Sequence, residues 1–169
     1  MVSYMVSSLR CVTTISFDFK GLFAIMKKTD KLVRYLITDI EGKDVLEVAC
    51  GTADFSIAAS TYASKISCID LDDSRLHKQL LNKKINFEIM NASAMTYPGE
   101  TFDTIVIYNA FAHIESQWES IKAECLRVLK LSGILYIVSS WKLDNSILSD
   151  TFGKDAFQND EFMIVKLCK

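Results

Sequence analysis

The sequence predicts an α/β protein: a three-layer α-β-α sandwich around a mostly parallel sheet. Two observations lead to this prediction. Short apolar runs of strand length alternate with segments whose apolar residues recur at helical spacing. The runs are apolar on both faces, which is typical of parallel strands covered by helices on each side. Half of the 169 residues are hydrophobic, so we expect residues 1–169 to form a single domain with one sizeable core.

The elements are expected in the following order. Residues 1–16 show little periodicity and are expected to be a mobile leader. Helical spacing over 19–40 predicts an N-terminal helical segment that ends before Gly42. The remaining segments predict strands at 44–48, 65–70, 85–90, 103–108, 134–139 and 161–167, and helices at 54–63, 73–81, 117–130 and 144–151.

Two local signals delimit the helix expected at 117–130. Ser116 and Glu119 match the S-x-x-E capping box, in which each side chain bonds the other residue's backbone N–H. Gly133 is expected to form the turn that ends the connection to the next strand.

The turn after the first predicted strand is the first candidate site. It consists of small residues from Ala49 to Ala53, and Gly51 allows the backbone to turn tightly and approach a ligand. Asp70 follows nineteen residues later, at the end of the second strand, where a carboxylate can accept both hydroxyls of a ribose. Ligands of parallel sheets bind at the carboxyl ends of the strands, so this pattern predicts a nucleoside cofactor.

Five segments in sequence order then resemble one family. VLEVACGTADFS, residues 45–56, resembles the first motif of class I S-adenosylmethionine (SAM)-dependent methyltransferases, which have a Rossmann-like sheet. The resemblance covers about residues 40–140 and is closest in type to the ubiquinone/menaquinone-biosynthesis group. The other four segments are CIDLDDSRL, EIMNASAMTYP, FDTIVIYNAFAHI and ECLRVLKLSGILYI.

This resemblance implies a SAM site, with S-adenosylhomocysteine as the product. By the same resemblance Glu47 orients the methionine end of SAM, Asp70 binds the ribose and Asn91 bonds the adenine amino group. The other cofactor-binding residues that it implies are Ala49, Cys50, Gly51, Leu71, Ala92 and Asn109.

The sequence also departs from the family pattern. Ala49 and Ala53 stand at the first and third glycine positions; Ala49 is expected to be a mild change, and Ala53 to clash if its φ is positive. The family ends in an antiparallel hairpin, but only one clear strand, 161–167, follows Ser140, so a shortened C-terminal hairpin is expected.

His113 is the candidate catalytic residue. It follows the fourth strand on the ligand side of the sheet, and an imidazole suits proton transfer near neutral pH. The alternative is that it packs against or caps the next helix. A base is needed only if the methyl acceptor loses a proton.

Three other functions are alternatives to this interpretation. A nicotinamide-dependent dehydrogenase would carry G-x-G-x-x-G in the first turn, which ACGTAD lacks. A methyltransferase of exocyclic amino groups would carry (N/D)-P-P-(Y/F), where this chain has NAFA at 109–112. The third alternative is a catalytically weak or inactive SAM-binding protein that acts as a partner subunit.

Composition limits the partners. The net charge is −2 and no basic block occurs, which favours a small-molecule acceptor over nucleic acid. No apolar run approaches the roughly 20 residues of a membrane span. Five cysteines without a C-x-x-C pair predict no metal site and a reducing, cytoplasmic environment. An uncovered sheet edge would favour a homodimer.

Overall fold

The computed structural model describes residues 26–78, 80 and 85–169, and one seven-stranded sheet organises them. The strand order is β3-β2-β1-β4-β5-β7-β6. The first five strands pair in parallel, whereas β7 is antiparallel to both β5 and β6. The strands are β1 Asp44–Val48, β2 Lys65–Asp70, β3 Ile85–Ile89, β4 Phe102–Tyr108, β5 Leu129–Ser139, β6 Ala156–Asn159 and β7 Phe162–Cys168.

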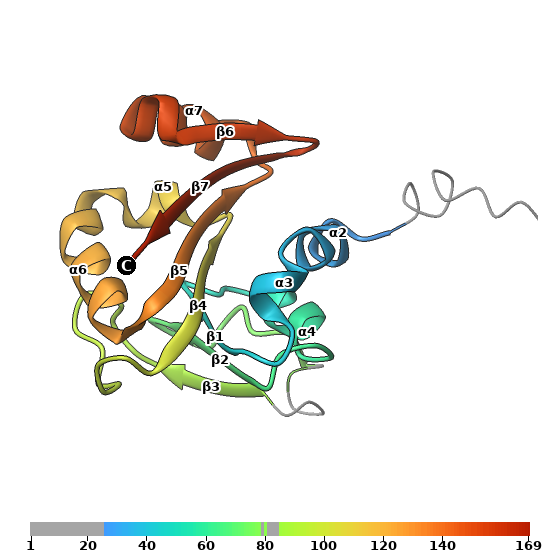
Figure 1. Cartoon of the computed structure of the whole chain (residues 1–169), viewed down its shortest axis with the longest axis vertical. Coiled ribbons are helices and arrows are strands. Elements are labelled where there is room, and N and C mark those ends of the chain that lie inside the picture. The colour runs from blue at the N-terminus through green and yellow to red at the C-terminus, as the bar shows by residue number, and fades with distance from the viewer. Residues whose placement is uncertain (1–25, 79, 81–84) are drawn as a thin grey trace, which may run out of the picture.

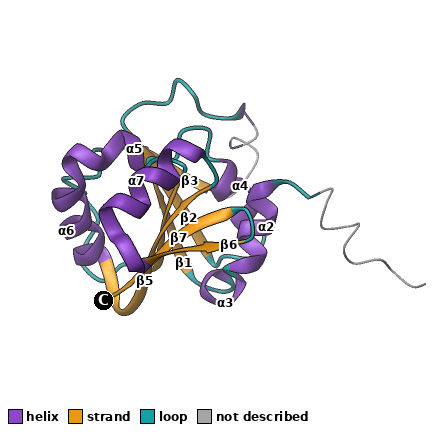
Figure 2. Cartoon of the chain, turned by 90° about the horizontal axis from the view of Figure 1, so that it is seen from above, coloured by secondary structure: helices purple, strands orange, loops and turns teal. Residues whose placement is uncertain are grey.

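Helices cover both faces of the sheet, which confirms the predicted three-layer, Rossmann-like sandwich (Figures 1 and 2). One face carries α2 Lys28–Tyr35, α3 Ile37–Ile40 and α4 Asp54–Ala59. The other carries α5 Phe111–Ile114, α6 Trp118–Val128 and α7 Lys142–Phe152.

Each face has its own apolar core. On the first face, Leu32 of α2 and Leu36 directly after it pack with Val106 of β4 and Ile164 of β7, all of them buried. On the second face, the aromatic rings of Phe111, Trp118 and Phe152 meet with centroids 5.2 to 5.6 Å apart and join α5, α6 and α7. These contacts fix the helices that flank the strand ends.

The chain order places a crevice beside β1. From β1 the chain builds outward to β2 and β3 and then returns to the other side of β1 as β4. The connections after β1 and β4 therefore diverge to opposite faces, and ligands of such sheets bind where this happens.

The C-terminal hairpin is complete in topology, so the expectation of a single strand after Ser140 is wrong. Strand β6 pairs with β7 from Ala156 opposite Val165 to Asn159 opposite Phe162. It was missed because it has only four residues, AFQN, and its side chains are half-buried or exposed. A strand so short and so little buried carries no hydrophobic alternation.

Gly133 lies inside β5 and forms no turn, contrary to the sequence prediction. Strand β5 starts at Leu129, directly after α6, and its register against β4 shifts before Ile134. A Cβ at position 133 would lie 2.6 Å from Leu129 Cγ and 2.9 Å from the Asp103 carbonyl oxygen. Glycine is therefore required there by lack of space.

The predicted capping box is also wrong. The residue that precedes α6 is Gln117, and no side chain caps the helix. A 3-10 turn, Glu115–Gln117, comes first and places Ser116 outside the cap position.

The α-helix predicted at 73–81 is absent from its described residues: 73–77 form bends, turns and irregular backbone, and Lys78 and Leu80 have 3-10 conformation. Asp72 Oδ1 accepts hydrogen bonds from the backbone N–H of Ser74, at 2.9 Å, and from its hydroxyl. Such local side-chain bonds compete with the helical ladder. The helix predicted at 54–63 is present but ends at Ala59. The leader at 1–16 lies outside the described residues, as does part of the 19–40 segment.

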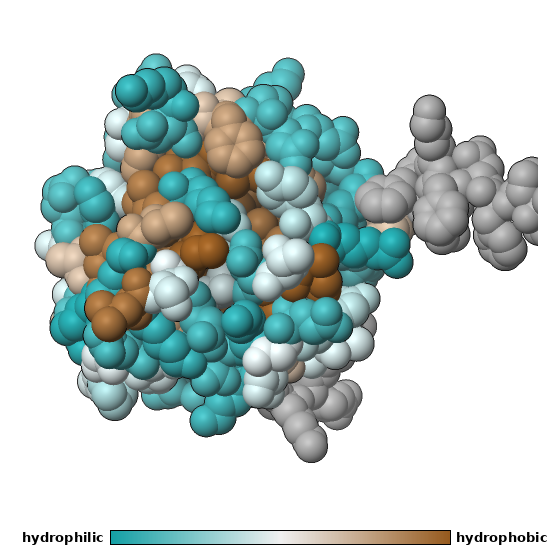
Figure 3. Space-filling model, viewed as in Figure 1, coloured by the Kyte–Doolittle hydropathy of each residue, from teal (hydrophilic) through white to brown (hydrophobic). Residues whose placement is uncertain are grey.

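The surface shown in Figure 3 is mostly hydrophilic, with hydrophobic side chains gathered over the β5–β7 region. Phe157 of the edge strand β6 is 42% exposed there. Within the described part of the chain, no helix is long and apolar enough to cross a membrane, and no group of His, Cys, Asp and Glu could hold a metal ion.

Candidate functional site

A cavity of about 670 Å³ opens at the carboxyl ends of β1, β2 and β4. All ten residues that the sequence singled out contribute to its lining, although they come from four separate segments of the chain. They are Glu47, Ala49, Cys50, Gly51, Asp70, Leu71, Asn91, Ala92, Asn109 and His113.

The turn after β1 has an alternating backbone. Ala49, Gly51 and Ala53 have φ values of 55°, 53° and 58°, whereas most residues with a side chain avoid this left-handed region. These are the three glycine positions of the family motif, so the turn keeps the glycine conformation even with two alanines. Each alanine there costs about 1–2 kcal/mol relative to a right-handed conformation. The change at Ala49 is therefore not mild, contrary to expectation.

Ala53 has a positive φ, the condition under which a clash with the cofactor was expected. The residue nevertheless lies outside the cavity lining. It is fully buried, it does not contribute to the cavity lining, and it packs with Cys50, Cys68 and Leu80. The expected clash with a cofactor is therefore not found, and the cost of Ala53 is the strain of its left-handed backbone.

Glu47 is a buried carboxyl group at the floor of the cavity, only 1% exposed. Its Oε2 accepts hydrogen bonds from the backbone N–H of Ser56 at 2.9 Å and from the Ser56 hydroxyl at 2.6 Å. Burial nevertheless raises the pKa of Glu47 to about 8, because the charged form loses its hydration. A cationic group of a ligand would favour the charged form.

Asp70 is held rigidly at the end of β2. Its Oδ2 accepts from the Gly51 N–H and its Oδ1 from the Leu71 N–H, both at 2.7 Å. The guanidinium of Arg75 lies 3.9 Å from Oδ2. Arg75 also lines the cavity, and sequence reasoning missed it because its position depends on the turn after Asp72, where a helix was predicted from residue 73.

Two asparagines shape the rest of the rim. Asn91 Oδ1 accepts from the Ser93 N–H and hydroxyl, each at 2.9 Å, so its amide oxygen already stabilises its own turn. Asn109, with φ of 52°, accepts from the Ser140 N–H at 2.7 Å and donates from Nδ2 to the Ser140 hydroxyl at 3.3 Å. Asn109 therefore joins the ends of β4 and β5.

His113 and Cys50 both line the cavity but differ in exposure and in reactivity. His113 is exposed on α5, at the rim, with its backbone N–H bonded to the Ala110 carbonyl at 3.0 Å. Cys50 is buried, and contact with Cys68 together with burial raises its pKa, so it is a neutral thiol unsuited to nucleophilic attack.

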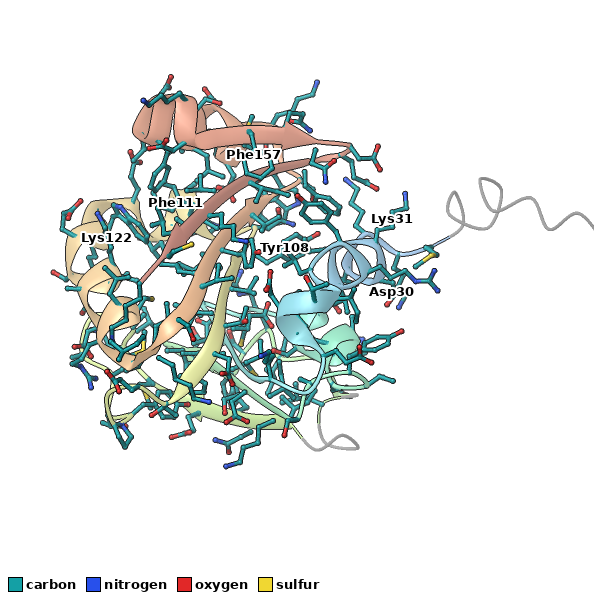
Figure 4. The ribbon with its side chains drawn as sticks, viewed as in Figure 1. Asp30, Lys31, Tyr108, Phe111, Lys122 and Phe157 are labelled. Atoms are coloured by element: carbon teal, nitrogen blue, oxygen red, sulfur yellow. The ribbon has the colours of Figure 1, made fainter. Side chains whose placement is uncertain are left out.

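A second cavity, of about 630 Å³, adjoins the first between α2 and α4. Four residues line both spaces: Asp54, Tyr108, Asn109 and Trp141. Figure 4 shows Tyr108 beside α2, away from Phe111 on the other side of the sheet. Of these four residues, only Asn109 was among the predicted cofactor-binding residues.

The residues present fit an adenosyl cofactor. The first cavity is within the usual 300–1,000 Å³ of small-molecule sites. Gly51 carries no side chain at the turn, where only the Arg75 guanidinium lies close to it, and Ala53 does not contribute to the cavity lining.

Comparison with known proteins decides the family. The family described as the methyltransferase domain matches residues 45–133, more than half of the chain. This chain belongs to that family. The resemblance to class I SAM-dependent methyltransferases is thereby confirmed, and the matched region contains all ten site residues.

Individual relatives agree with this assignment. A ubiquinone/menaquinone biosynthesis C-methyltransferase from Marinomonas sp. is 28% identical over 127 residues, covering 69% of this chain and 50% of that protein. A demethylmenaquinone methyltransferase from Thermotoga maritima is 27% identical over 119 residues, covering 69% and 52%. The chain thus spans about half the length of the curated relatives it matches.

Among solved structures, a SAM-dependent methyltransferase from Aquifex aeolicus superposes with a TM-score of 0.63 at 18% identity, covering 89% of this chain and 97% of that one. A second solved structure, of a protein from Bacillus halodurans, gives a TM-score of 0.60 at 22% identity, covering 74% of this chain and 56% of that one. At this identity the likeness shows the shared fold.

Proposed function

We propose that this protein transfers a methyl group from SAM to a small-molecule acceptor and releases S-adenosylhomocysteine. The observation that carries the proposal is the convergence of the ten predicted residues on one cavity at the strand ends. Family membership supports the reaction class. The proposal extends to residues 1–169 acting as a single domain in the cytoplasm.

The chain's own residues would bind and orient the cofactor. Glu47 would accept a hydrogen bond from the charged amino group of the methionine end. Because burial raises the pKa of Glu47, its carboxyl would release a proton to the solvent when this cation binds. Asp70, fixed by two backbone N–H groups, would receive the ribose hydroxyls. Leu71, Asn91 and Ala92 would surround the adenine.

The chemistry that SAM supplies when bound is an electrophilic methyl group, whose carbon bonds to an acceptor atom as the C–S bond breaks and the electron pair stays on sulfur. Positioning of donor and acceptor and exclusion of water are the main contributions of the protein. An acceptor hydroxyl must also lose a proton, and we propose His113 as the group that takes it. Because His113 lines the first cavity and not the second, this role requires the hydroxyl to reach into the first cavity.

The alternative of a catalytically weak partner subunit gains no support from the comparisons, since the curated relatives named above are methyltransferases. The exposed edge strand β6 supports the proposal of a homodimer, which light scattering would test; a monomer at micromolar concentration would contradict it.

The first test is thermal unfolding with SAM, S-adenosylhomocysteine or NAD in large excess. A ligand at about 100 times its Kd stabilises by roughly 2.7 kcal/mol, which in a domain of this size raises the midpoint by about 5–10 °C. We expect this shift with both adenosyl ligands and none with NAD. No shift with any ligand would contradict the proposed cofactor.

A further inference from the structure

The second cavity adjoins the cofactor cavity along Asp54, Tyr108, Asn109 and Trp141. Methyl transfer requires the reacting atoms to come within about 3–3.5 Å, so an acceptor has to reach the cofactor cavity. The second cavity offers space that adjoins it directly along these four residues. Resting on the proposed function, we infer that the second cavity binds the acceptor, and that this acceptor is a compact aromatic compound carrying a hydroxyl group and an acidic group.

Two aromatic side chains at the border favour a planar ligand. Trp141 follows β5 and is 52% exposed, so its indole presents a flat apolar surface beside both cavities. The Tyr108 hydroxyl lies 3.4 Å from the Ser140 hydroxyl, and Ser140 is itself bonded to Asn109. The Tyr108 ring is therefore held in place at the end of β4. Aromatic rings in offset or edge contact contribute more than their buried area alone.

The outer wall of the cavity is polar. Hydroxyl groups come from Thr29 of α2 and from Thr61 and Tyr62, which follow α4. Such a wall suits a compact ligand with hydrogen-bonding substituents. A long aliphatic chain would cover these groups without bonding them, which costs free energy.

The charges favour an acidic substituent at the end away from the cofactor. Asp54 accepts a hydrogen bond from the Thr52 hydroxyl at 2.9 Å and lies on the border with the first cavity. Beyond it, the start of α2 and the residue before it contribute two lysines, Lys27 and Lys28, against one acid, Asp30. Lys28 lies 3.5 Å from Glu161.

Glu161 shares its single negative charge between Lys28 and Lys31, so the three side chains together remain positive. It is bonded more closely by Lys31, at 2.8 Å, and Figure 4 shows Lys31 directed toward the β6–β7 hairpin. Lys28 itself is about half exposed, at 51%. An anionic group on the ligand would therefore meet two lysines at this end.

The test is isothermal titration calorimetry of the full chain saturated with S-adenosylhomocysteine. The probe is 3,4-dihydroxybenzoate, and geranylhydroquinone, which has a long apolar chain and no acidic group, is the comparison compound. We expect saturable binding of the first and weaker or no binding of the second. Either no binding of 3,4-dihydroxybenzoate or tighter binding of geranylhydroquinone overturns the assigned acceptor class.

Variants locate the probe. Lys27→Glu should weaken 3,4-dihydroxybenzoate binding by about tenfold, as expected for loss of a charge-assisted contact. Lys122→Glu is the matched control, because Lys122 lies on α6, far from Tyr108 in Figure 4, and should leave binding unchanged. Thr61→Trp places a large side chain at an exposed position on the cavity wall and should abolish probe binding.

S-adenosylhomocysteine affinity, measured on the same samples, separates the two proposals. We expect it to be unchanged in all three variants. If the wild type binds S-adenosylhomocysteine but not the probe, or if Thr61→Trp binds the probe normally, the inference is wrong and the proposed function stands. If the wild type does not bind S-adenosylhomocysteine, the proposed function fails and the inference fails with it.

Discussion

Replacement of Glu47 by glutamine should change how stability depends on pH. The pKa of Glu47 is about 8 in the folded protein, against an ordinary value of 4.5 for a solvated carboxyl. Between these values the folded chain binds more protons than the unfolded chain, so the free energy of unfolding falls as pH rises through this window. The gap corresponds to roughly 5 kcal/mol for full ionisation, as an order of magnitude.

Glutamine cannot ionise, and its amide oxygen can still accept from the N–H and hydroxyl of Ser56. Wild type and Glu47→Gln should therefore have similar stability near pH 5, and the variant should become more stable, by several kcal/mol, toward pH 8. Urea unfolding of both proteins across this range gives the difference directly. The exposed Glu119→Gln on α6 is the control and should follow the wild type.

A stability difference between Glu47→Gln and wild type that does not change with pH would refute this reasoning. It would mean that Glu47 is already charged in the folded protein at neutral pH. The two bonds from Ser56 would then outweigh the cost of burial.

Three further predictions concern single side chains. Asp70→Ala should weaken SAM binding by about 1–3 kcal/mol in calorimetry, whereas Asp73→Ala, at an exposed neighbour, should leave it unchanged. If both variants bind SAM with the same affinity, Asp70 does not bind the ribose. Gly133→Ala should lower the free energy of unfolding by about 1–3 kcal/mol, because the added methyl group meets Leu129 and the Asp103 carbonyl. Gly99→Ala, where the nearest atom is 3.4 Å away, should cost much less, and similar losses would show that space is not the cause. Gly51→Ala should destabilise by about 1–2 kcal/mol in urea unfolding, since φ is 53°, and an unchanged midpoint would argue against strain in this turn.

Much of the cofactor cavity could be predicted from sequence, because its residues directly follow strands. Glu47, Asp70 and Asn109 sit at or just beyond strand ends, and parallel strands bring those ends to one edge of the sheet. Once the strands are recognised, proximity follows from topology.

The features that the sequence did not predict depend on side-chain bonds that compete with a helix, or on how closely neighbouring residues pack in the folded chain. The position of Arg75 depends on the bonds between Asp72 and Ser74, which outweighed the helical tendency of that segment. The role of Gly133 depends on the closeness of Leu129 and Asp103, which no linear pattern records. The left-handed backbone at Ala49 runs against residue preference and is maintained by the turn around it.

The bond between Lys31 and Glu161 has a consequence for biosynthesis. It joins α2 to the hairpin turn across 130 residues, and α2 also packs against Phe162 and Ile164 of β7. A ribosome that adds about 5–20 residues per second needs roughly 6–26 s to synthesise that span. During this interval α2 lacks its β7 partner, so the wall that it gives to the second cavity forms only after translation has passed the hairpin.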